Sequence, residues 1–149
     1  MCRILIALIA LTLTVQAYAA EKSDKDPIEI HQGVWKPIAA SMNGKRLPKV
    51  ALDMITLTIK GTNYVVTVEG EDHDDKGTFA IDASVKPHRM TIKSNEGPNN
   101  GKTFLAVFEH KHKDAMRVSY DLSGKEFPTV WRTRKGSSLY VVGYRRKKD

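Results

Sequence analysis

Cysteine is almost absent from this chain of 149 residues, which has a single one, Cys2, near its start. One cysteine excludes an internal disulfide framework and a thiolate-rich zinc site. Long apolar runs are missing too. The longest covers residues 4–15 and includes two threonines, which is too short to span a bilayer comfortably, and a polytopic membrane protein is excluded. Acidic residues are fewer than basic ones, 17 against 24, so the formal charge is +7.

What the chain does have is enough apolar material for one folded domain. Hydrophobic residues make up 41% of the sequence, which excludes disorder throughout. A length of 149 residues is in the range of a single domain with short appendages.

The first residues have the pattern of a secretory signal peptide. Arg3 supplies the positive charge, residues 4–15 form the apolar region, and residues 17–19 (Ala-Tyr-Ala) provide small residues at a cleavage site. We predict a signal peptide over residues 1–19, cleaved after Ala19, with cleavage after Ala20 as second choice; a short membrane anchor is the alternative. Because Cys2 precedes the apolar run, lipid attachment there is disfavoured. The protein is therefore expected to be exported, to the periplasm or out of the cell.

The remaining chain divides into three parts. Residues 20–30 are polar and charged, so we predict a flexible linker. Residues 31–146 form the predicted domain, and residues 147–149 a basic tail. After such a cleavage the chain would have no transmembrane segment.

Short segments with alternating apolar and polar residues begin at residue 33 and predict antiparallel strands. In residues 55–60 three apolar residues, at 55, 57 and 59, alternate with polar ones, and Gly-Thr-Asn follows as a hairpin turn. Pro37 has no N–H, so it must lie at an edge or a bulge of the first strand. No segment has a helical period longer than two turns. The other predicted strands cover residues 34–40, 64–68, 77–81, 90–93, 103–108, 115–121, 129–133 and 139–145.

Short hairpins in sequence favour an up-and-down meander, and eight such strands can close into a barrel without free edges. The predicted fold class is therefore all-β, an eight-stranded antiparallel up-and-down barrel. The parity of the strands directs one face of each inward. The residues of this face that could bind a ligand are Leu57, Tyr64, Val66, Phe79, Phe104, Phe108, Met116, Tyr120 and Trp131, and further inward residues are Ile59, Ile81, Met90, Ile92 and Val118. A core filled by its own side chains needs the same residues, so both interpretations stay open.

Several short motifs follow one another along the domain. They are Gly-Val-Trp-Lys at 33–36, Asn-Gly-Lys at 43–45, Leu-Pro at 47–48, Leu-Thr-Ile-Lys-Gly at 57–61, Gly-Thr-Phe at 77–79, Gly-Pro-Asn at 97–99, Gly-Lys-Thr at 101–103, Gly-Lys-Glu at 124–126, Pro-Thr at 128–129 and Tyr-Arg-Arg at 144–146. In this order they resemble the lipocalin-like domain family of exported proteins of planctomycete-type bacteria, over residues 31–146. The resemblance implies an eight-stranded lipocalin-like barrel and brings no catalytic residues.

Gly33 and Trp35 are also similar to the Gly-x-Trp opening of lipocalins. There the tryptophan packs across the closed end of the barrel and a late arginine covers its ring. The resemblance implies the same structural role for Arg145 or Arg146 here, through a cation–π contact and burial of the arginine stem.

Two groups of polar residues could bind a metal. Residues 69–75 include five acidic residues and superficially resemble a calcium loop, but Lys76 and Ala83 stand where oxygen ligands belong. His110 and His112 could share a strand face, but further ligands are needed and the neighbouring lysines oppose a cation. We favour a solvated hairpin tip and a loop, and predict no metal and no cofactor. No nucleophile with its base can be argued from the residues, so no enzyme is expected.

Residues 129–149 contain one acid and seven basic residues, which are Arg132, Arg134, Lys135, Arg145, Arg146, Lys147 and Lys148. Such a segment could contact anionic lipid, polysaccharide or nucleic acid; export disfavours nucleic acid, and a solvated hairpin with a basic tail is the alternative. Two functions therefore remain. One is binding of a small apolar or amphipathic molecule inside the barrel, which a cavity above about 300 Å³ would favour. The other is an interaction or scaffold module of the cell envelope, with a filled barrel and a basic outer surface.

Overall fold

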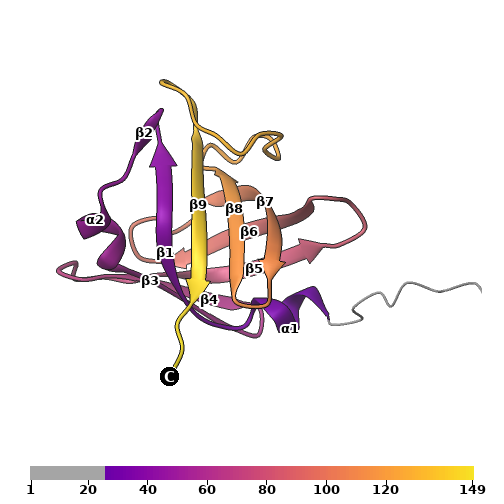
Figure 1. Ribbon diagram of the computed structural model, residues 1–149, viewed down its shortest axis with the longest axis horizontal. Helices are drawn as coiled ribbons and strands as arrows, with labels where there is room; N and C mark the ends of the chain where they lie inside the picture. The colour runs from indigo at the N-terminus through magenta and orange to yellow at the C-terminus, as the bar shows by residue number, and fades with distance from the viewer. Residues whose placement is uncertain (1–25) are drawn as a thin grey trace, which may run out of the picture.

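The computed structural model describes residues 26–149, so the predicted signal peptide and residues 20–25 of the predicted linker lie outside it. Within this range one antiparallel sheet runs in the order β2-β1-β3-β4-β5-β6-β7-β8-β9, and a second pairing, of β1 with β9, closes it into a barrel (Figure 1). The strands are β1 (Gly33–Met42), β2 (Lys45–Arg46), β3 (Ile55–Lys60), β4 (Asn63–Val68), β5 (Asp75–Asp82), β6 (His88–Glu96), β7 (Thr103–His112), β8 (Ala115–Asp121) and β9 (Leu139–Arg146).

Eight strands form the wall of the barrel, because β2 is a two-residue arm that pairs only with the end of β1. Each of the other strands pairs with its neighbours in the closed ring, and all of these pairings are antiparallel. The predicted fold class, an all-β eight-stranded antiparallel up-and-down barrel, is confirmed.

Pro37 lies at a β-bulge, as its missing N–H requires. The register of β1 against β9 shifts between Pro37 and Ala39, and the side chain of the intervening Ile38 points outward and is 56% exposed. β1 pairs with β3 only over Gly33–Trp35. After the bulge, β1 is no longer paired with β3; it continues along β9, and its last two residues also pair with β2.

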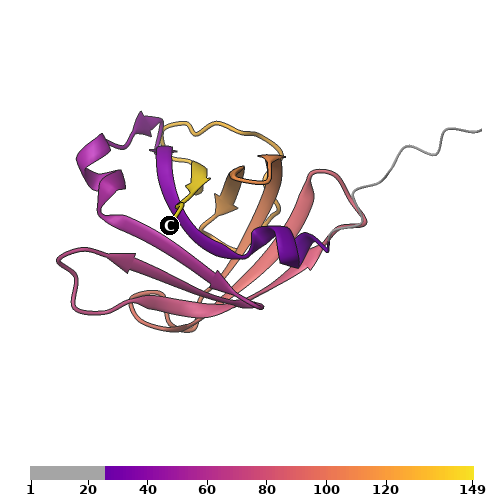
Figure 2. The ribbon, with the colours of Figure 1, turned by 60° about the horizontal axis from the view of Figure 1, so that its bottom comes forward.

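The second helix, α2 (Lys49–Asp53), packs where β1 and β3 separate. Figure 2 shows the two strands diverging, with α2 beside their separated ends. Leu52 of this helix is 4% exposed and belongs to the core. The helix thus covers the stretch where β1 and β3 are no longer paired.

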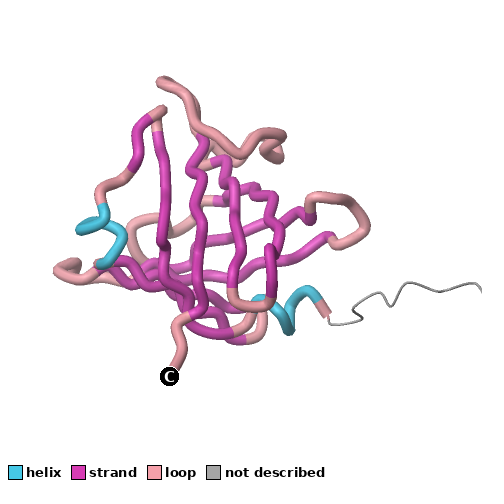
Figure 3. The backbone as a smooth tube through the Cα atoms, viewed as in Figure 1, coloured by secondary structure: helices cyan, strands magenta, loops and turns pink. Residues whose placement is uncertain are grey.

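The first helix, α1 (Pro27–His31), corrects the predicted linker, which extended to residue 30. The Asp26 carboxylate accepts a hydrogen bond from the N–H of Ile28 at 2.9 Å, and Pro27 occupies the first turn, where its missing N–H costs nothing. The helix has one turn, too few residues for a periodic pattern. It lies across one end of the barrel, apart from α2 (Figure 3). No helix among residues 26–149 is long and apolar enough to cross a bilayer.

The strand predicted at residues 129–133 is wrong: residues 122–138 form a long loop between β8 and β9. The Asp121 carboxylate accepts hydrogen bonds from the backbone of residues 123, 125 and 126 at 2.9–3.0 Å and from the Ser138 hydroxyl at 2.6 Å, so both ends of the loop are tied to one side chain. The Trp131 ring packs outside the barrel under the guanidinium of Arg117, 4.1 Å from the ring centroid. The alternation of residues 129–133 therefore reflects packing of a loop on the outer wall.

Candidate functional site

The barrel contains a cavity of about 510 Å³ that is lined mainly by aliphatic and aromatic side chains. Six of the nine predicted interior residues line it, namely Leu57, Tyr64, Val66, Phe79, Phe104 and Tyr120, and so do Ile59, Met90 and Ile92. The lining also includes Met42, Leu122 and Lys102, which lie beside turns at the end of the barrel opposite α1. We refer to that end as the open end, and to the end covered by α1 as the closed end.

Part of the barrel interior, on the side of β7 and β8, is filled by side chains. Phe108 and Val118 have no exposed surface and Met116 is 2% exposed, but none of the three lines the cavity. Phe108 and Met116 were predicted as ligand-binding candidates, and the structure places both in the packed core. Trp131 was also predicted to face inward, and this is corrected because it lies on the outer wall. The interior is thus packed around these three residues, while the hollow beside them extends from the open end to His31 at the closed end.

Asp75 places a carboxylate in the wall of this apolar cavity. The Ser94 hydroxyl donates a hydrogen bond to its Oδ1 at 2.6 Å, and the Asn99 amide donates to its Oδ2 at 3.3 Å. The Tyr64 hydroxyl lies 3.5 Å from the same Oδ2. Asp75 was predicted to belong to a solvated hairpin tip, and the structure instead makes it the first residue of β5. Asp75 lies two and four residues before Gly77 and Phe79, so its side chain points to the same inner face of β5. This spacing was the signal that could have identified Asp75 as a cavity residue.

Three further tyrosines, Tyr120, Tyr140 and Tyr144, meet on the opposite part of the cavity wall. The hydroxyls of Tyr120 and Tyr144 are 3.2 Å apart, and the rings of Tyr120 and Tyr140 are stacked with centroids 5.7 Å apart. Burial raises the pKa of Tyr140 to about 12 and that of Tyr64 to about 12 as well, so both hydroxyls keep their protons at neutral pH. Tyr140 and Tyr144 were missed from the sequence, because β9 carries apolar residues at both parities.

His31 of α1 forms part of the cavity lining at the closed end and is 1% exposed. Its ring packs 4.9 Å from the Phe108 ring, and its Nδ1 lies 3.3 Å from Nε2 of His110. Burial, followed by the charges of its neighbours, lowers the pKa of His31 to about 3 and the pKa of His110 to about 4. Both rings are therefore neutral at pH 7, and they can accept or donate one hydrogen bond at each nitrogen.

The histidines predicted as a weak metal option do not act together. The register of β7 against β8 shifts between His110 and His112, and the His112 ring accepts a hydrogen bond from the N–H of Asp114 at 3.2 Å. In the part of the chain that the structure describes, no three His, Cys, Asp or Glu side chains lie close enough to hold a metal ion.

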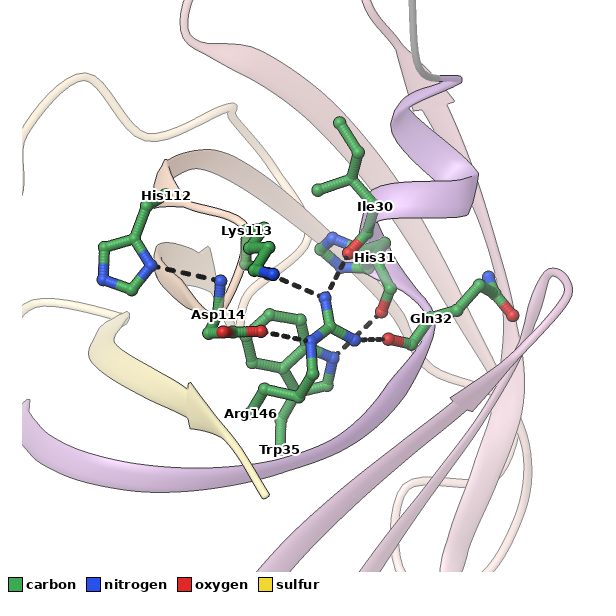
Figure 4. Close-up of polar contacts among 8 residues, drawn as sticks. All are labelled: Ile30, His31, Gln32, Trp35, His112, Lys113, Asp114 and Arg146. Atoms are coloured by element: carbon green, nitrogen blue, oxygen red, sulfur yellow. Dashed lines mark hydrogen bonds and ion pairs between the residues drawn. The ribbon is translucent and has the colours of Figure 1, made fainter. Parts of the chain in front are cut away.

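Arg146 connects the segments that meet at the closed end of the barrel (Figure 4). Its guanidinium donates hydrogen bonds to the carbonyls of Ile30 and Gln32 beside α1, to the carbonyl of Lys113 at 2.7 Å, and to the Asp114 carboxylate at 3.1 Å. These contacts connect α1 with the turn between β7 and β8.

The same guanidinium covers the Trp35 ring at 4.3 Å from its centroid, and the Trp35 indole donates to the His31 carbonyl at 2.9 Å. Of the two arginines considered for this role, the structure selects Arg146, while Arg145 is exposed. Gly33 has φ +116°, and a Cβ there would lie 2.7 Å from a guanidinium nitrogen of Arg146. Only glycine both adopts this backbone conformation readily and leaves room for the arginine.

The seven basic residues of the C-terminal segment do not form one patch. β9 runs from the open end to the closed end, so Arg132, Arg134 and Lys135 precede it and Arg145 to Lys148 end it or follow it. An eight-residue strand separates these groups by about 25 Å. Arg146 is in addition engaged in the contacts of the closed end. Contact of this segment with an anionic envelope surface stays a prediction.

Comparison of the chain with family models, with curated proteins and with solved structures gave no match.

Proposed function

We propose that this protein is an exported lipocalin-like barrel that binds a small apolar or amphipathic molecule in the cavity inside the barrel. The observation that carries the proposal is the volume of about 510 Å³, which falls within the range of about 300–1,000 Å³ that is typical of ligand pockets. The pair formed by Trp35 and Arg146 at the closed end supports the lipocalin-like assignment. Export rests on the N-terminal sequence pattern.

Side chains around a hollow make fewer packing contacts than side chains in a filled core, and this loss of contacts supports a functional reason for the cavity. An eight-stranded barrel can be filled completely by its own side chains, and the part around Phe108 and Val118 is filled in this way, since neither residue has exposed surface. The part around the cavity therefore departs from the packing that the same fold achieves a few residues away.

The rim of the open end favours entry of an apolar body. Met42 and Leu122 line the cavity and are 39% and 38% exposed. Apolar side chains that are exposed at the mouth of a hollow allow an apolar ligand to leave water gradually as it enters. The cavity thus disfavours the alternative of a scaffold module with a filled barrel.

A bulky substitution in the cavity tests the proposal. Phe104→Trp adds volume to the cavity wall, and Phe127→Trp makes the same change on the outer surface, where Phe127 packs under Arg89. With an apolar fluorescent probe such as N-phenyl-1-naphthylamine, we expect the wild type and Phe127→Trp to bind alike. Phe104→Trp should weaken binding by about tenfold, or about 1.4 kcal/mol, with little change in stability.

A barrel filled by its own side chains would give the opposite result. In a filled core, Phe104→Trp would overpack the interior and destabilise the protein by about 1–3 kcal/mol. If the wild type binds no probe and Phe104→Trp is destabilised in this way, the ligand-binding proposal is refuted. Native mass spectrometry of protein purified from its own host would then show the barrel without a bound small molecule.

A further inference from the structure

Asp75 places a carboxylate in the wall of an apolar cavity, and its three side-chain partners are all neutral. Ser94, Asn99 and Tyr64 hold the carboxylate at 2.6, 3.3 and 3.5 Å. No Lys or Arg nitrogen of residues 26–149 lies within 4.0 Å of it. Asp75 is half-buried, and a carboxylate partly removed from water is stabilised most by an opposite charge, which the described chain does not place within this distance.

The backbone around Asp75 is built so that an aromatic ring lies next to the carboxylate. Tyr64 in β4 pairs with Gly77 in β5, and a Cβ on Gly77 would lie 2.8 Å from the Tyr64 ring and 1.9 Å from the Lys93 carbonyl oxygen. The absence of a side chain at Gly77 therefore lets the ring lie against β5 with its hydroxyl directed at Asp75.

We infer that the cavity takes an amphipathic amine, whose apolar body fills the hollow and whose ammonium group pairs with Asp75 beside the Tyr64 ring. This inference rests on the proposed function and names the chemical class of the ligand. An ionised carboxylate has about four acceptor sites, of which the three neutral donors take three, so one is left for an N–H of the ligand.

Lys102 also lines the cavity, and its positive charge would favour a ligand with an anionic head group over an amine. Its side chain is exposed, and no hydrogen bond or ion pair to it is found among the described residues. A lysine that is free in water loses rotamer freedom when it binds a ligand, whereas Asp75 is already held in position. The observations therefore favour the cationic head group, and the anionic one becomes an outcome of the test.

The test uses three probes with the same chain and different head groups: n-decylamine, n-decanol and n-decanoate. Their affinities are measured by displacement of the fluorescent probe at neutral pH. We expect the wild type to bind n-decylamine about tenfold more tightly than n-decanol, as one charge-assisted contact allows, and n-decanoate most weakly. Asp75→Asn should remove the preference for the amine and leave the affinity for n-decanol nearly unchanged.

Asp72→Asn is the matched control, because it removes the same charge from the exposed turn between β4 and β5. It should keep the preference for n-decylamine, which separates contact with Asp75 from a general effect of net charge. Lys102→Gln should likewise keep this preference.

Three results would overturn the inference. They are equal or tighter binding of n-decanoate by the wild type, an amine preference that persists in Asp75→Asn, or one that is lost in Lys102→Gln. The comparison of the three probes on the wild type decides the matter even if Asp75→Asn fails to fold. If none of the three probes binds, the proposed function itself has failed; if n-decanol binds without an amine preference, only the inference has failed.

Discussion

Replacing Arg146 with methionine should loosen the closed end of the barrel. The substitution keeps an unbranched apolar stem over Trp35 but removes the guanidinium, and with it the ion pair to Asp114 and the hydrogen bonds to the carbonyls of Ile30, Gln32 and Lys113. Hydrogen bonds from a charged donor contribute about 1.5–3 kcal/mol each.

Water can replace some of the hydrogen bonds that the substitution removes. The side chains of Arg146 and Asp114 are 24% and 23% exposed, so the ion pair contributes about 1 kcal/mol or less. The hydrogen bond to the Lys113 carbonyl is exposed to water as well. We therefore expect a loss of about 2–4 kcal/mol in the free energy of unfolding, including the cation–π contact with the ring.

Urea unfolding followed by circular dichroism measures this loss, and Arg145→Met is the matched control. Arg145 is the neighbouring residue of β9 and is exposed, so its replacement should change stability by less than about 0.5 kcal/mol. Arg146→Lys should recover part of the loss, because an ammonium keeps the charge but cannot reach several acceptors in one plane. If Arg146→Met is as stable as Arg145→Met, the guanidinium does not hold the closed end and the reasoning is refuted.

Two more predictions concern the same end of the barrel. Trp35→Ala removes a ring that has no exposed surface and should cost about 3–5 kcal/mol in thermal or urea unfolding, and a cost under about 1 kcal/mol would contradict closure of the barrel by this residue. The second concerns pH: folding lowers the pKa of His31 to about 3 and that of His110 to about 4, from 6.5. The unfolded chain then takes up protons before the folded one does, so stability is complete above pH 6.5 and falls as the pH is lowered toward 4. The slope is at most about 1.4 kcal/mol per pH unit for each histidine, and equal urea midpoints at about pH 7 and about pH 5 would show that these rings are not held neutral.

Most of the fold could be predicted because strand formation depends on a local pattern. The alternation in β3 is visible in six residues, since side chains of a strand point alternately to opposite faces wherever the strand lies. The bulge at Pro37 follows from the chemistry of one residue. The contact of Trp35 with a late arginine was anticipated from the resemblance to lipocalins, and the structure decided between Arg145 and Arg146.

Residue patterns along the chain did not predict the segments outside the strands correctly. Residues 129–133 were predicted as a strand, but Trp131 packs on the outer wall against Arg117 and Val130 is exposed. α1 was assigned to a linker because a single turn has no period, and it is stabilised instead by burial of His31 and by the carbonyl contacts of Arg146. Both segments obtain their structure from residues far away in the sequence.

Within the strands, the sequence by itself determined whether a side chain points inward or outward, and the tertiary structure decided what it meets there. Phe104 and Phe108 share one face of β7, four residues or about 13 Å apart, yet the first lines the cavity and the second is packed with no exposed surface. Asp75 has inward parity as well, and its role depends on Ser94, Asn99 and Tyr64 from three other segments. Parity is a property of the local backbone, whereas depth along the barrel axis depends on the stagger of all eight strands and on what covers each end.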